Sequence, residues 1–270
     1  MLFCCPKCGL ALEEKGNVTS CKNGHSFDRA KGGYYNLLLS NKGGVHGDNK
    51  DMVLARRAFL GAGYYAPLAE RVASLAAEYT SSGSVLLDAG CGEGYYTDKV
   101  ESAVRAKYGE SRVCAFDISK DAVREARRKN SFIELAVAGS YSMPLPDGSV
   151  DAVINTFSPL ALSEVARVLS SHGTFIIVIP GEEHLYELKS AIYDTPYKNT
   201  VSDTALDGFS LFLDEKLSFR MHLPSPEAVG ALFKMTPYAY RTSPENVKKV
   251  EALESLVCTA DFRILVYRKQ

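Results

Sequence analysis

Short apolar runs and amphipathic stretches alternate along the chain from residue 85 onward. Apolar runs lie at residues 85–87, 113–116, 132–137, 150–157 and 174–179, and helical periodicity lies at 96–107, 120–129, 162–169 and 184–193. Strands that are apolar throughout and alternate with helices are typical of a parallel sheet covered on both faces. Residues 209–220, 226–234 and 262–268 supply the remaining strands and a helix. We therefore expect an α/β fold with a doubly wound, mostly parallel, seven-stranded Rossmann-like sheet.

The first 80 residues follow a different pattern. Residues 1–33 have little apolar periodicity, and residues 40–51 are rich in Gly, Asn and Asp, which is typical of a loop. Helical patterns follow at about 51–60 and 68–79. These changes predict three segments: a small module at 1–35, a linker and helical segment at 36–80, and the large α/β domain at 81–270.

Composition narrows the class of protein. Hydrophobic residues make up 46% of the 270 residues and charged residues 23%, which excludes disorder as the dominant state. The chain contains no apolar run near the length of a membrane span and no signal-peptide pattern at its start, so we expect a cytoplasmic protein that does not bind membranes. The net charge is −1, but the first 60 residues hold nine Lys and Arg against five Asp and Glu. Any binding of nucleic acid must therefore use a local patch.

Four residues near the N-terminus have the spacing of a metal site. Cys5, Cys8, Cys21 and His25 form the pattern C-x2-C-x12-C-x3-H. Zinc prefers four such ligands at the corners of a tetrahedron, and four protein ligands leave no open position, so this pattern predicts a closed, structural Zn²⁺ site. A redox Cys-x-x-Cys motif would follow a strand in a thioredoxin-like setting, which is missing here.

A glycine-rich turn follows the first strand of the large domain. Gly90, Gly92 and Gly94 let a ligand lie against bare backbone at the carboxyl end of that strand. Their G-x-G-x-G spacing departs from the dinucleotide pattern G-x-G-x-x-G, and Asp88 before them would repel a pyrophosphate. Asp117, at the end of the next strand, can accept hydrogen bonds from a ribose. The combination fits S-adenosylmethionine better than NAD, although a tight strand–helix turn without a ligand is the alternative.

Several blocks of sequence resemble one family. Residues 87–97 resemble motif I of the class I methyltransferases, and residues 27–38, 55–68, 180–189 and 235–238 look like the bacterial 23S ribosomal RNA (guanine-N1)-methyltransferases. The resemblance runs in order along nearly the whole chain.

The resemblance implies a function and a set of binding residues. It implies a zinc-containing enzyme that uses S-adenosylmethionine to methylate N1 of a guanine in a hairpin of 23S ribosomal RNA, with the zinc module helping to recognise the RNA, and a homodimer. Carried over to this chain, the cofactor residues are Tyr65, Gly92, Glu93 and His184. Asp88, Gly90, Gly94 and Asp117 join them by the reasoning above. Residues 154–159 stand where class I enzymes contact the substrate base, and they lack the Asn-Pro-Pro-Tyr form used for exocyclic amines, which fits a ring nitrogen. The sequence names no catalytic base.

Other interpretations remain open from the sequence. The chain could be a small-molecule methyltransferase with an incidental zinc module, or an RNA-binding protein with a degenerate cofactor fold. Candidate phosphate contacts are Arg56 and Arg57 with Lys42 and Lys50. Two further sets of cations could be either RNA contacts or solvated surface: Lys7, Lys15, Lys22, Arg29 and Lys31 around the metal ligands, and Arg124, Arg127, Arg128 and Lys129 on one predicted helix.

Overall fold

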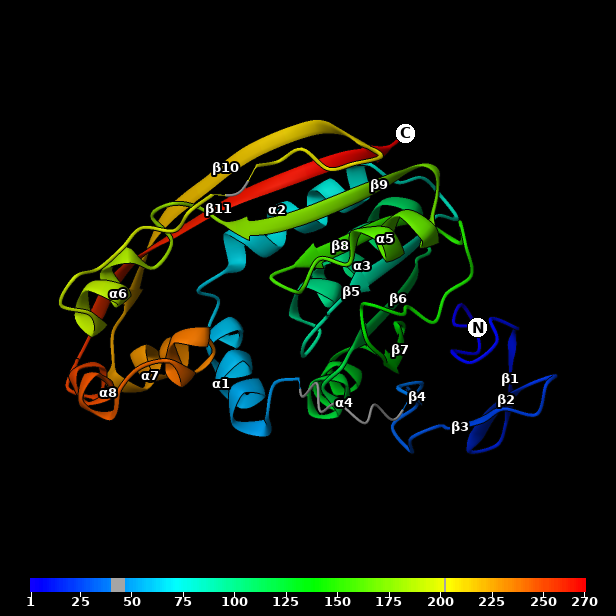
Figure 1. The fold of residues 1–270 in the computed structure, drawn as a ribbon, viewed down its shortest axis with the longest axis horizontal. Coiled ribbons are helices and arrows are strands. Elements are labelled where there is room, and N and C mark those ends of the chain that lie inside the picture. Colours follow the sequence, from blue (N-terminus) through cyan, green and yellow to red (C-terminus); the bar gives the residue numbers. More distant parts are fainter. Residues whose placement is uncertain (40–46, 202) are drawn as a thin grey trace.

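The computed structural model describes residues 1–39, 47–201 and 203–270. Within these residues the chain forms a small antiparallel sheet and a large mixed sheet (Figure 1). The strands of the small sheet are β1 (Leu12–Lys15), β2 (Val18–Cys21) and β3 (Ser26–Asp28). The strands of the large sheet are β4 (Tyr35–Asn36), β5 (Val85–Ala89), β6 (Arg112–Asp117), β7 (Glu134–Val137), β8 (Val150–Thr156), β9 (Leu169–Pro180), β10 (Phe209–Leu223) and β11 (Leu256–Lys269).

The large sheet has the strand order β10-β11-β9-β8-β5-β6-β7-β4. The pairs β8–β9, β5–β8, β5–β6, β6–β7 and β4–β7 are parallel, and only the pairs made by β11 are antiparallel in this described sheet. The predicted α/β class with a mostly parallel Rossmann-like sheet is therefore confirmed. Because strand order reverses at β5, the carboxyl ends of β5 and β8 open a crevice where this class of fold binds ligands.

Alternate side chains of the central strands face two separate hydrophobic cores. The helices are α1 (Lys50–Gly61), α2 (Ala66–Glu78), α3 (Tyr95–Tyr108), α4 (Lys120–Lys129), α5 (Leu162–Val168), α6 (Tyr186–Ile192), α7 (Pro226–Lys234) and α8 (Pro244–Glu251), with a 3-10 turn at Pro237–Tyr240. Leu86 and Ile154 face the core that also contains residues of α2, α3 and α4. Leu87 and Val153 face the core that contains residues of α5 and the small sheet. This two-sided burial explains why the strands read as apolar throughout.

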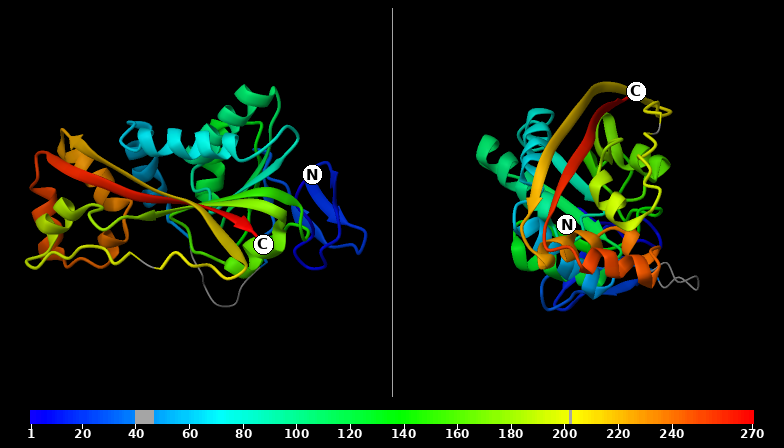
Figure 2. Two further views of the ribbon diagram at one scale, coloured as in Figure 1. Left: turned by 90° about the horizontal axis from the view of Figure 1, so that it is seen from above. Right: turned by 90° about the vertical axis from the view of Figure 1, so that its left-hand side faces the viewer.

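The long β10–β11 pair leads away from the parallel strands toward α6, α7 and α8 at one end of the molecule, and the small sheet lies at the opposite end (Figures 1 and 2). Helix α1 lies between these ends and contacts both α7 and α4. None of the helices in the described ranges is long and apolar enough to cross a membrane.

The structure differs from the sequence prediction at several edges. An eighth strand, β4, joins the large sheet beside β7. The sequence did not predict it, because two residues are too few to give a period-2 signal. The predicted strand at 132–137 begins only at Glu134, and Phe132 is exposed in the preceding loop. The helix predicted from residue 184 begins at Tyr186, because Leu185 adopts a left-handed φ of 57°. Helix α8 was not predicted.

The small sheet is bonded to the large domain. The Leu2 amide donates to both carboxylate oxygens of Glu134, at 2.8 and 3.0 Å, and the Cys4 amide donates to the Pro144 carbonyl at 2.8 Å. Phe3 is buried in the core that it shares with the central strands. These contacts fix the orientation of the N-terminal module, which would otherwise have only a few apolar side chains to hold it in place.

Candidate functional site

The four predicted metal ligands lie together in the small sheet. Cys5 and Cys8 come from the turn before β1, Cys21 ends β2 and His25 precedes β3. Their ligand atoms all lie within 4.8 Å of one another. Cys4 does not belong to this set. The predicted cluster is confirmed.

The distances within the cluster fit a tetrahedral zinc ion. The Cys8 and Cys21 sulfurs are 3.7 Å apart, and Nδ1 of His25 lies 3.4 Å from the Cys5 sulfur and 3.5 Å from the Cys21 sulfur. With Zn–S bonds of about 2.3 Å and Zn–N bonds of about 2.0 Å, tetrahedral geometry requires about 3.8 Å between sulfurs and about 3.5 Å between sulfur and nitrogen. The site is a closed zinc centre that stabilises the ribbon and has no free position for chemistry.

The glycine-rich turn lies at the carboxyl end of β5. The amides of Gly90 and Cys91 both donate to the Phe116 carbonyl at 2.9 Å, which ties the turn to the end of β6. Gly90 and Gly94 have φ values of 88° and 77°, in the left-handed region that favours glycine. A Cβ on Gly90 would lie 2.4 Å from the Cβ of Ser158, and one on Gly94 would lie 2.9 Å from the Cβ of Ala126. The backbone thus passes as close to its neighbours as glycine permits.

Three carboxylates surround this turn. Asp88 accepts a 2.5 Å hydrogen bond from the Thr97 hydroxyl, and Asp117 accepts from the amides of Gly92 and Ser119 at 3.0 and 2.7 Å. Burial raises the pKa of Asp88 to about 7, and the negative charges of Asp117 and Glu93 add to the effect. Burial also raises the pKa values of Glu93 and Asp117 above their usual range. The site therefore favours a cationic ligand and disfavours a pyrophosphate.

Several buried polar atoms beside the turn have no hydrogen-bond partner among the described residues. They are Oδ1 of Asp88, Oε2 of Glu93, the Tyr96 hydroxyl and Oγ1 of Thr156. Leaving such atoms unpaired costs about 1–3 kcal/mol each, so a polar ligand that supplies partners is expected to bind here. S-adenosylmethionine carries a positive charge and many donors, and the residues present fit it.

Arg56 of α1 reaches into the same site. Its guanidinium pairs with Asp48, lies 4.0 Å from the Glu93 carboxylate, and would lie 3.5 Å from a Cβ on Gly92. The sequence prediction had grouped Arg56 with the phosphate contacts, and the structure instead turns its charge toward these carboxylates. Lys42, from the same group, lies outside the described residues.

The aromatic wall of the site is a cluster of five rings: Tyr65, Tyr96, Phe157, His184 and Phe262. Tyr96, two residues after Gly94, has its ring centroid 6.4 Å from that of Phe157. Phe157 stacks on His184 with an interplanar angle of 18° and packs 5.5 Å from Phe262. The Tyr65 hydroxyl lies 3.4 Å from Nε2 of His184. The fold therefore brings Tyr65 and His184, which are 119 residues apart, to the crevice that the glycine turn borders.

The hydrogen bonds of His184 define its protonation. The Asp261 amide donates to Nδ1 at 3.3 Å, so Nδ1 carries no proton. Burial lowers the pKa of His184 to about 3, and the positive charge of Lys189 lowers it further against the opposing effect of Asp261. The ring is thus neutral with its proton on Nε2, which can donate to the Tyr65 oxygen. His184 is therefore a weak base near neutral pH, and its Nε2 faces the Tyr65 hydroxyl.

Phe157 has an unusual backbone conformation. It follows β8 with a φ of 59°, and its side chain is 44% exposed although it lies within the aromatic wall. A bulky residue rarely adopts this φ, which costs about 1–3 kcal/mol and is held only where the surroundings impose it. The next residue is anchored on both sides, because the Ser158 hydroxyl donates to the Ala89 carbonyl at 2.6 Å and accepts from Asn155 at 2.8 Å.

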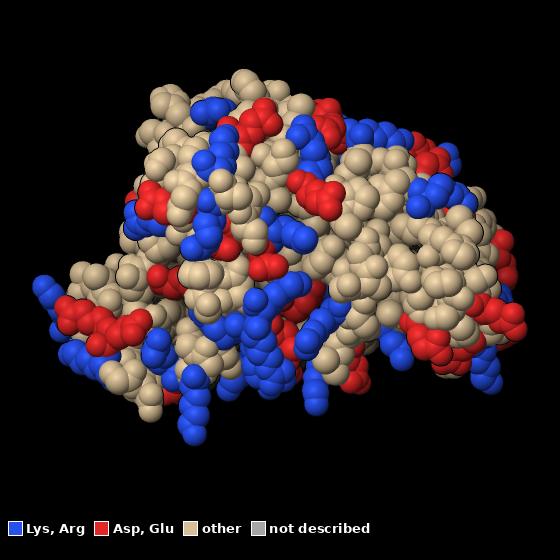
Figure 3. Space-filling model, turned by 180° about the vertical axis from the view of Figure 1, so that it is seen from behind, with Lys and Arg blue, Asp and Glu red and all other residues tan. Residues whose placement is uncertain are grey.

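Cations gather over α4 and α1 on one face of the molecule (Figure 3). Within the run predicted from the sequence, Arg127 is turned inward and donates to the carbonyls of Ser131 and Ile133 at 3.0 and 2.6 Å. The Arg124 and Arg128 side chains remain 42% and 62% exposed. The run is therefore divided between a structural role and an exposed face.

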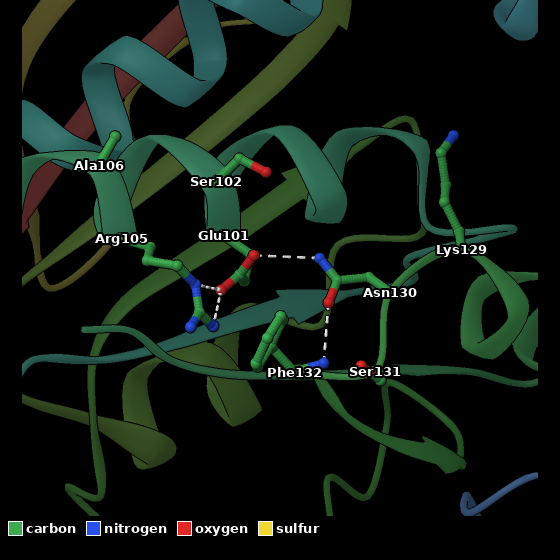
Figure 4. Close-up of a pocket in the computed structure, with 8 residues that line it drawn as sticks. All are labelled: Glu101, Ser102, Arg105, Ala106, Lys129, Asn130, Ser131 and Phe132. Carbon is green, nitrogen blue, oxygen red and sulfur yellow. Dashed lines mark hydrogen bonds and ion pairs between the residues drawn. The ribbon is translucent and has the colours of Figure 1, made fainter. Parts of the chain in front are cut away.

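One hollow lies apart from the glycine-rich turn. It has a volume of about 430 Å³ and lies between α3 and the loop before β7, where the Arg105 guanidinium covers the Phe132 ring at 3.7 Å (Figure 4). Glu101 inside it accepts hydrogen bonds from Arg105, Ser111 and Asn130. Its carboxylate is fully bonded, which indicates that this network holds α3 to the loop.

These features define a class of protein. A doubly wound sheet with a glycine turn at the end of one strand and an acid at the end of the next is typical of a class I S-adenosylmethionine-dependent methyltransferase, here with a zinc ribbon at its N-terminus. Residues 87–177 match the methyltransferase domain model, and residues 3–42 match the model described as "RlmA, N-terminal".

Relatives identify the family. The 23S rRNA (guanine(748)-N(1))-methyltransferase of Streptomyces fradiae is 31% identical over 91% of this chain and 88% of its own length. A protein of Micromonospora griseorubida, provisionally named a 23S rRNA (guanine-N1)-methyltransferase, is 32% identical over 98% of this chain and 96% of its own length. The chain belongs to the zinc-ribbon family of 23S rRNA (guanine-N1)-methyltransferases.

The sequence placed Arg56 among the candidate phosphate contacts and Phe157 within the segment expected to contact the base, but it did not show how either side chain lies in the site. Phe157 carries no motif, although its position directly after β8 is where substrate contacts are expected. The role of Arg56 depends on how α1 folds over the turn, which no local pattern reveals. Both residues become visible only through their tertiary neighbours.

Proposed function

We propose that the protein transfers a methyl group from S-adenosylmethionine to N1 of a guanine in a hairpin loop of 23S ribosomal RNA. The proposal is carried by two features that occur together. A zinc ribbon is bonded to the catalytic domain through Leu2 and Cys4, and a carboxylate-lined crevice in that domain lies beside an exposed aromatic ring. The full-length match to the family named above supports the choice of RNA over a small molecule.

Cofactor binding is assigned to residues on both sides of the crevice. S-adenosylmethionine supplies an electrophilic methyl group on a sulfonium. Gly90, Gly92 and Gly94 present bare backbone, and Asp88, Glu93 and Asp117 supply negative charge and hydrogen-bond acceptors. Tyr65, oriented by His184, presents its hydroxyl from the aromatic wall. Because the three carboxylates and the neutral imidazole are held in place before the ligand arrives, little reorganisation is needed on binding.

Transfer of a radioactive methyl group tests the proposed function. Purified protein, labelled S-adenosylmethionine and large-subunit RNA should give label in one guanine, located as N1-methylguanine by mass spectrometry. Replacing Asp117 with alanine should abolish transfer. Transfer to a free nucleoside or another small molecule, with none to RNA, would favour the small-molecule methyltransferase instead.

Phe157 is assigned to the target base. N1 of guanine lies in the Watson–Crick edge, so the base must leave its pair or come from a loop before it can react. An exposed aromatic ring held in a strained conformation at the crevice offers a stacking surface for such a base. Residues 155–158 do not form an Asn-Pro-Pro-Tyr motif, so we assign the positioning of the target base to the Phe157 ring.

Replacing Phe157 with alanine should lower kcat/KM for RNA by about tenfold to a hundredfold, since stacking on one base is worth about 1–3 kcal/mol. Phe157→Tyr should keep most of the activity, and the affinity for S-adenosylmethionine should change little in both variants. Phe212→Ala, which removes a 65% exposed ring on β10, is the matched control. Equal activity of Phe157→Ala and Phe212→Ala would remove Phe157 from the base site.

Cofactor affinity should depend on pH through Asp88. A cationic ligand binds the ionised carboxylate, and burial raises the pKa of Asp88 to about 7 in the free protein. Protonation must therefore compete with binding below this pKa, and affinity should be about fivefold to tenfold weaker at pH 6 than at pH 7.5. Calorimetry measures this, and Asp88→Asn should flatten the profile. The same profile in the wild type and in Asp88→Asn would show that Asp88 does not contact the cofactor.

The remaining assignments concern organisation. We infer that residues 1–35 recognise RNA, that 36–80 cover the cofactor site and that 81–270 form the methyltransferase domain. We also infer a homodimer, from the family resemblance, and a cytoplasmic location, which fits the sequence pattern and is where ribosomal RNA is found. Sedimentation velocity at several concentrations distinguishes a dimer from a monomer.

A further inference from the structure

A charged groove lies between α1 and α4, outside the cofactor crevice. It has a volume of about 220 Å³ and is lined by Val53 and Leu54 together with six charged side chains: Lys50, Arg57, Asp121, Arg124, Glu125 and Arg128. Four cations face two acids, whereas the chain as a whole has a net charge of −1. Positive charge is therefore concentrated in this groove.

Glu125 organises the cations. Its carboxylate is only 5% exposed, and it accepts from Arg57 of α1 and from Arg128 of α4, both at 2.5 Å. The Arg124 guanidinium lies 3.9 Å from it and 2.8 Å from Asp121. One buried carboxylate thus holds three guanidinium groups together, although their mutual repulsion opposes the arrangement. The Arg57 and Arg128 side chains stay 57% and 62% exposed, so their remaining donors face solvent.

The groove is close to both parts of the enzyme that must meet the RNA. The apolar face of α4 packs on the glycine turn, since a Cβ on Gly94 would lie 2.9 Å from Ala126. Arg124 and Arg128 lie on the opposite face of α4, so about one helix diameter, roughly 10 Å, separates them from the glycine turn. On the other side, a Cβ on Gly32 of the N-terminal module would lie 3.7 Å from Arg127. Figure 3 shows the cations continuing over α4 and α1 on this face.

We propose that this groove binds the phosphate backbone of the substrate RNA beside the base that enters the crevice. Guanidinium groups bind phosphate oxygens through two parallel hydrogen bonds, which suits them to a backbone that carries one charge on each nucleotide. Such contacts set the register of the RNA without reading its sequence. The proposal rests on the RNA substrate proposed above.

Binding of RNA at several salt concentrations tests the proposal. The probe is a fluorescent transcript of the 23S hairpin around the guanine that the Streptomyces relative is named for, with fluorescence anisotropy measured from about 50 to 300 mM KCl. Arg57→Gln, Arg124→Gln and Arg128→Gln should each weaken binding several-fold and lower the slope of log affinity against log salt by about 1. Arg128→Lys, which keeps the charge, should retain the slope.

Arg112→Gln is the matched control. Arg112 is an exposed arginine at the amino end of β6, away from the carboxyl ends of the strands, and its loss should leave the slope unchanged. Cofactor affinity, measured by calorimetry, should be the same in all variants and shows that each is folded. If the wild-type protein binds the RNA but all three glutamine variants keep its slope, the groove does not contact the RNA backbone. The proposed methylation of RNA would then still stand. Wild-type protein that does not bind the RNA overturns the function itself.

Discussion

Replacing Gly90 with alanine should weaken S-adenosylmethionine binding by about a hundredfold or more. The new Cβ would lie 2.4 Å from Cβ and 2.5 Å from Oγ of Ser158, and the backbone at Gly90 has a φ of 88° that alanine disfavours. Ser158 cannot withdraw, because its hydroxyl is bonded to Ala89 and Asn155. The turn must move instead, and a cost of about 3 kcal/mol from strain and clash corresponds to this loss. Calorimetric titration measures it.

Gly109→Ala separates strain from collision. Gly109 ends α3 with a φ of 81°, but a Cβ there would meet nothing within 4 Å. This variant should lose about 1 kcal/mol of stability or somewhat more, from the left-handed conformation alone. Its affinity for the cofactor should stay within about twofold of the wild type. If Gly109→Ala lost affinity as Gly90→Ala does, general destabilisation would explain both, and the close approach at Gly90 would not be the cause.

Removing zinc should abolish RNA methylation and leave cofactor binding in place. The N-terminal module contains three short strands and few apolar side chains, so metal binding supplies much of its folding free energy, on the order of 10 kcal/mol for sites of this kind. The glycine turn and its carboxylates belong to the separate large sheet. A chelator should therefore release one zinc per chain with loss of activity on RNA, while calorimetry still detects cofactor binding.

Two neighbouring cysteines provide the control. Cys21→Ser removes a ligand and should lower zinc content, measured by elemental analysis, together with RNA binding. Cys4→Ser changes a buried thiol that is not a member of the cluster, and zinc content should be unchanged. Full zinc content in Cys21→Ser, or its loss in Cys4→Ser, would contradict the assigned ligand set.

The metal cluster and the glycine turn show what short-range patterns can predict. Each half of the cluster spans four or five residues, so the chain's local geometry brings its ligands together and the spacing alone identifies them. The glycines and the acid that follows on the next strand likewise report a strand–turn–helix unit of fixed geometry. Alternating apolar segments predicted the parallel sheet for the same reason, because burial on both faces leaves a continuous apolar signature.

The edges of the fold were less predictable. The two residues of β4 are recognised as a strand only through their pairing with β7. Leu185 interrupts the helix predicted from residue 184 because its amide bonds to the Thr259 carbonyl and its backbone turns left-handed there. Tertiary contacts of this kind override local propensity and leave no periodic trace in the sequence.

The amino-acid sequence by itself determined the zinc ligands, the glycine-rich turn and the class of fold, because each depends on residues that are close along the chain or repeat with a regular period. Only the tertiary structure decided that His184 is neutral and orients Tyr65, that Arg56 faces carboxylates, and that Phe157 stands strained and exposed at the crevice. Those properties arise from burial and from partners tens to more than a hundred residues away, and the packing of the whole sheet is what brings them together.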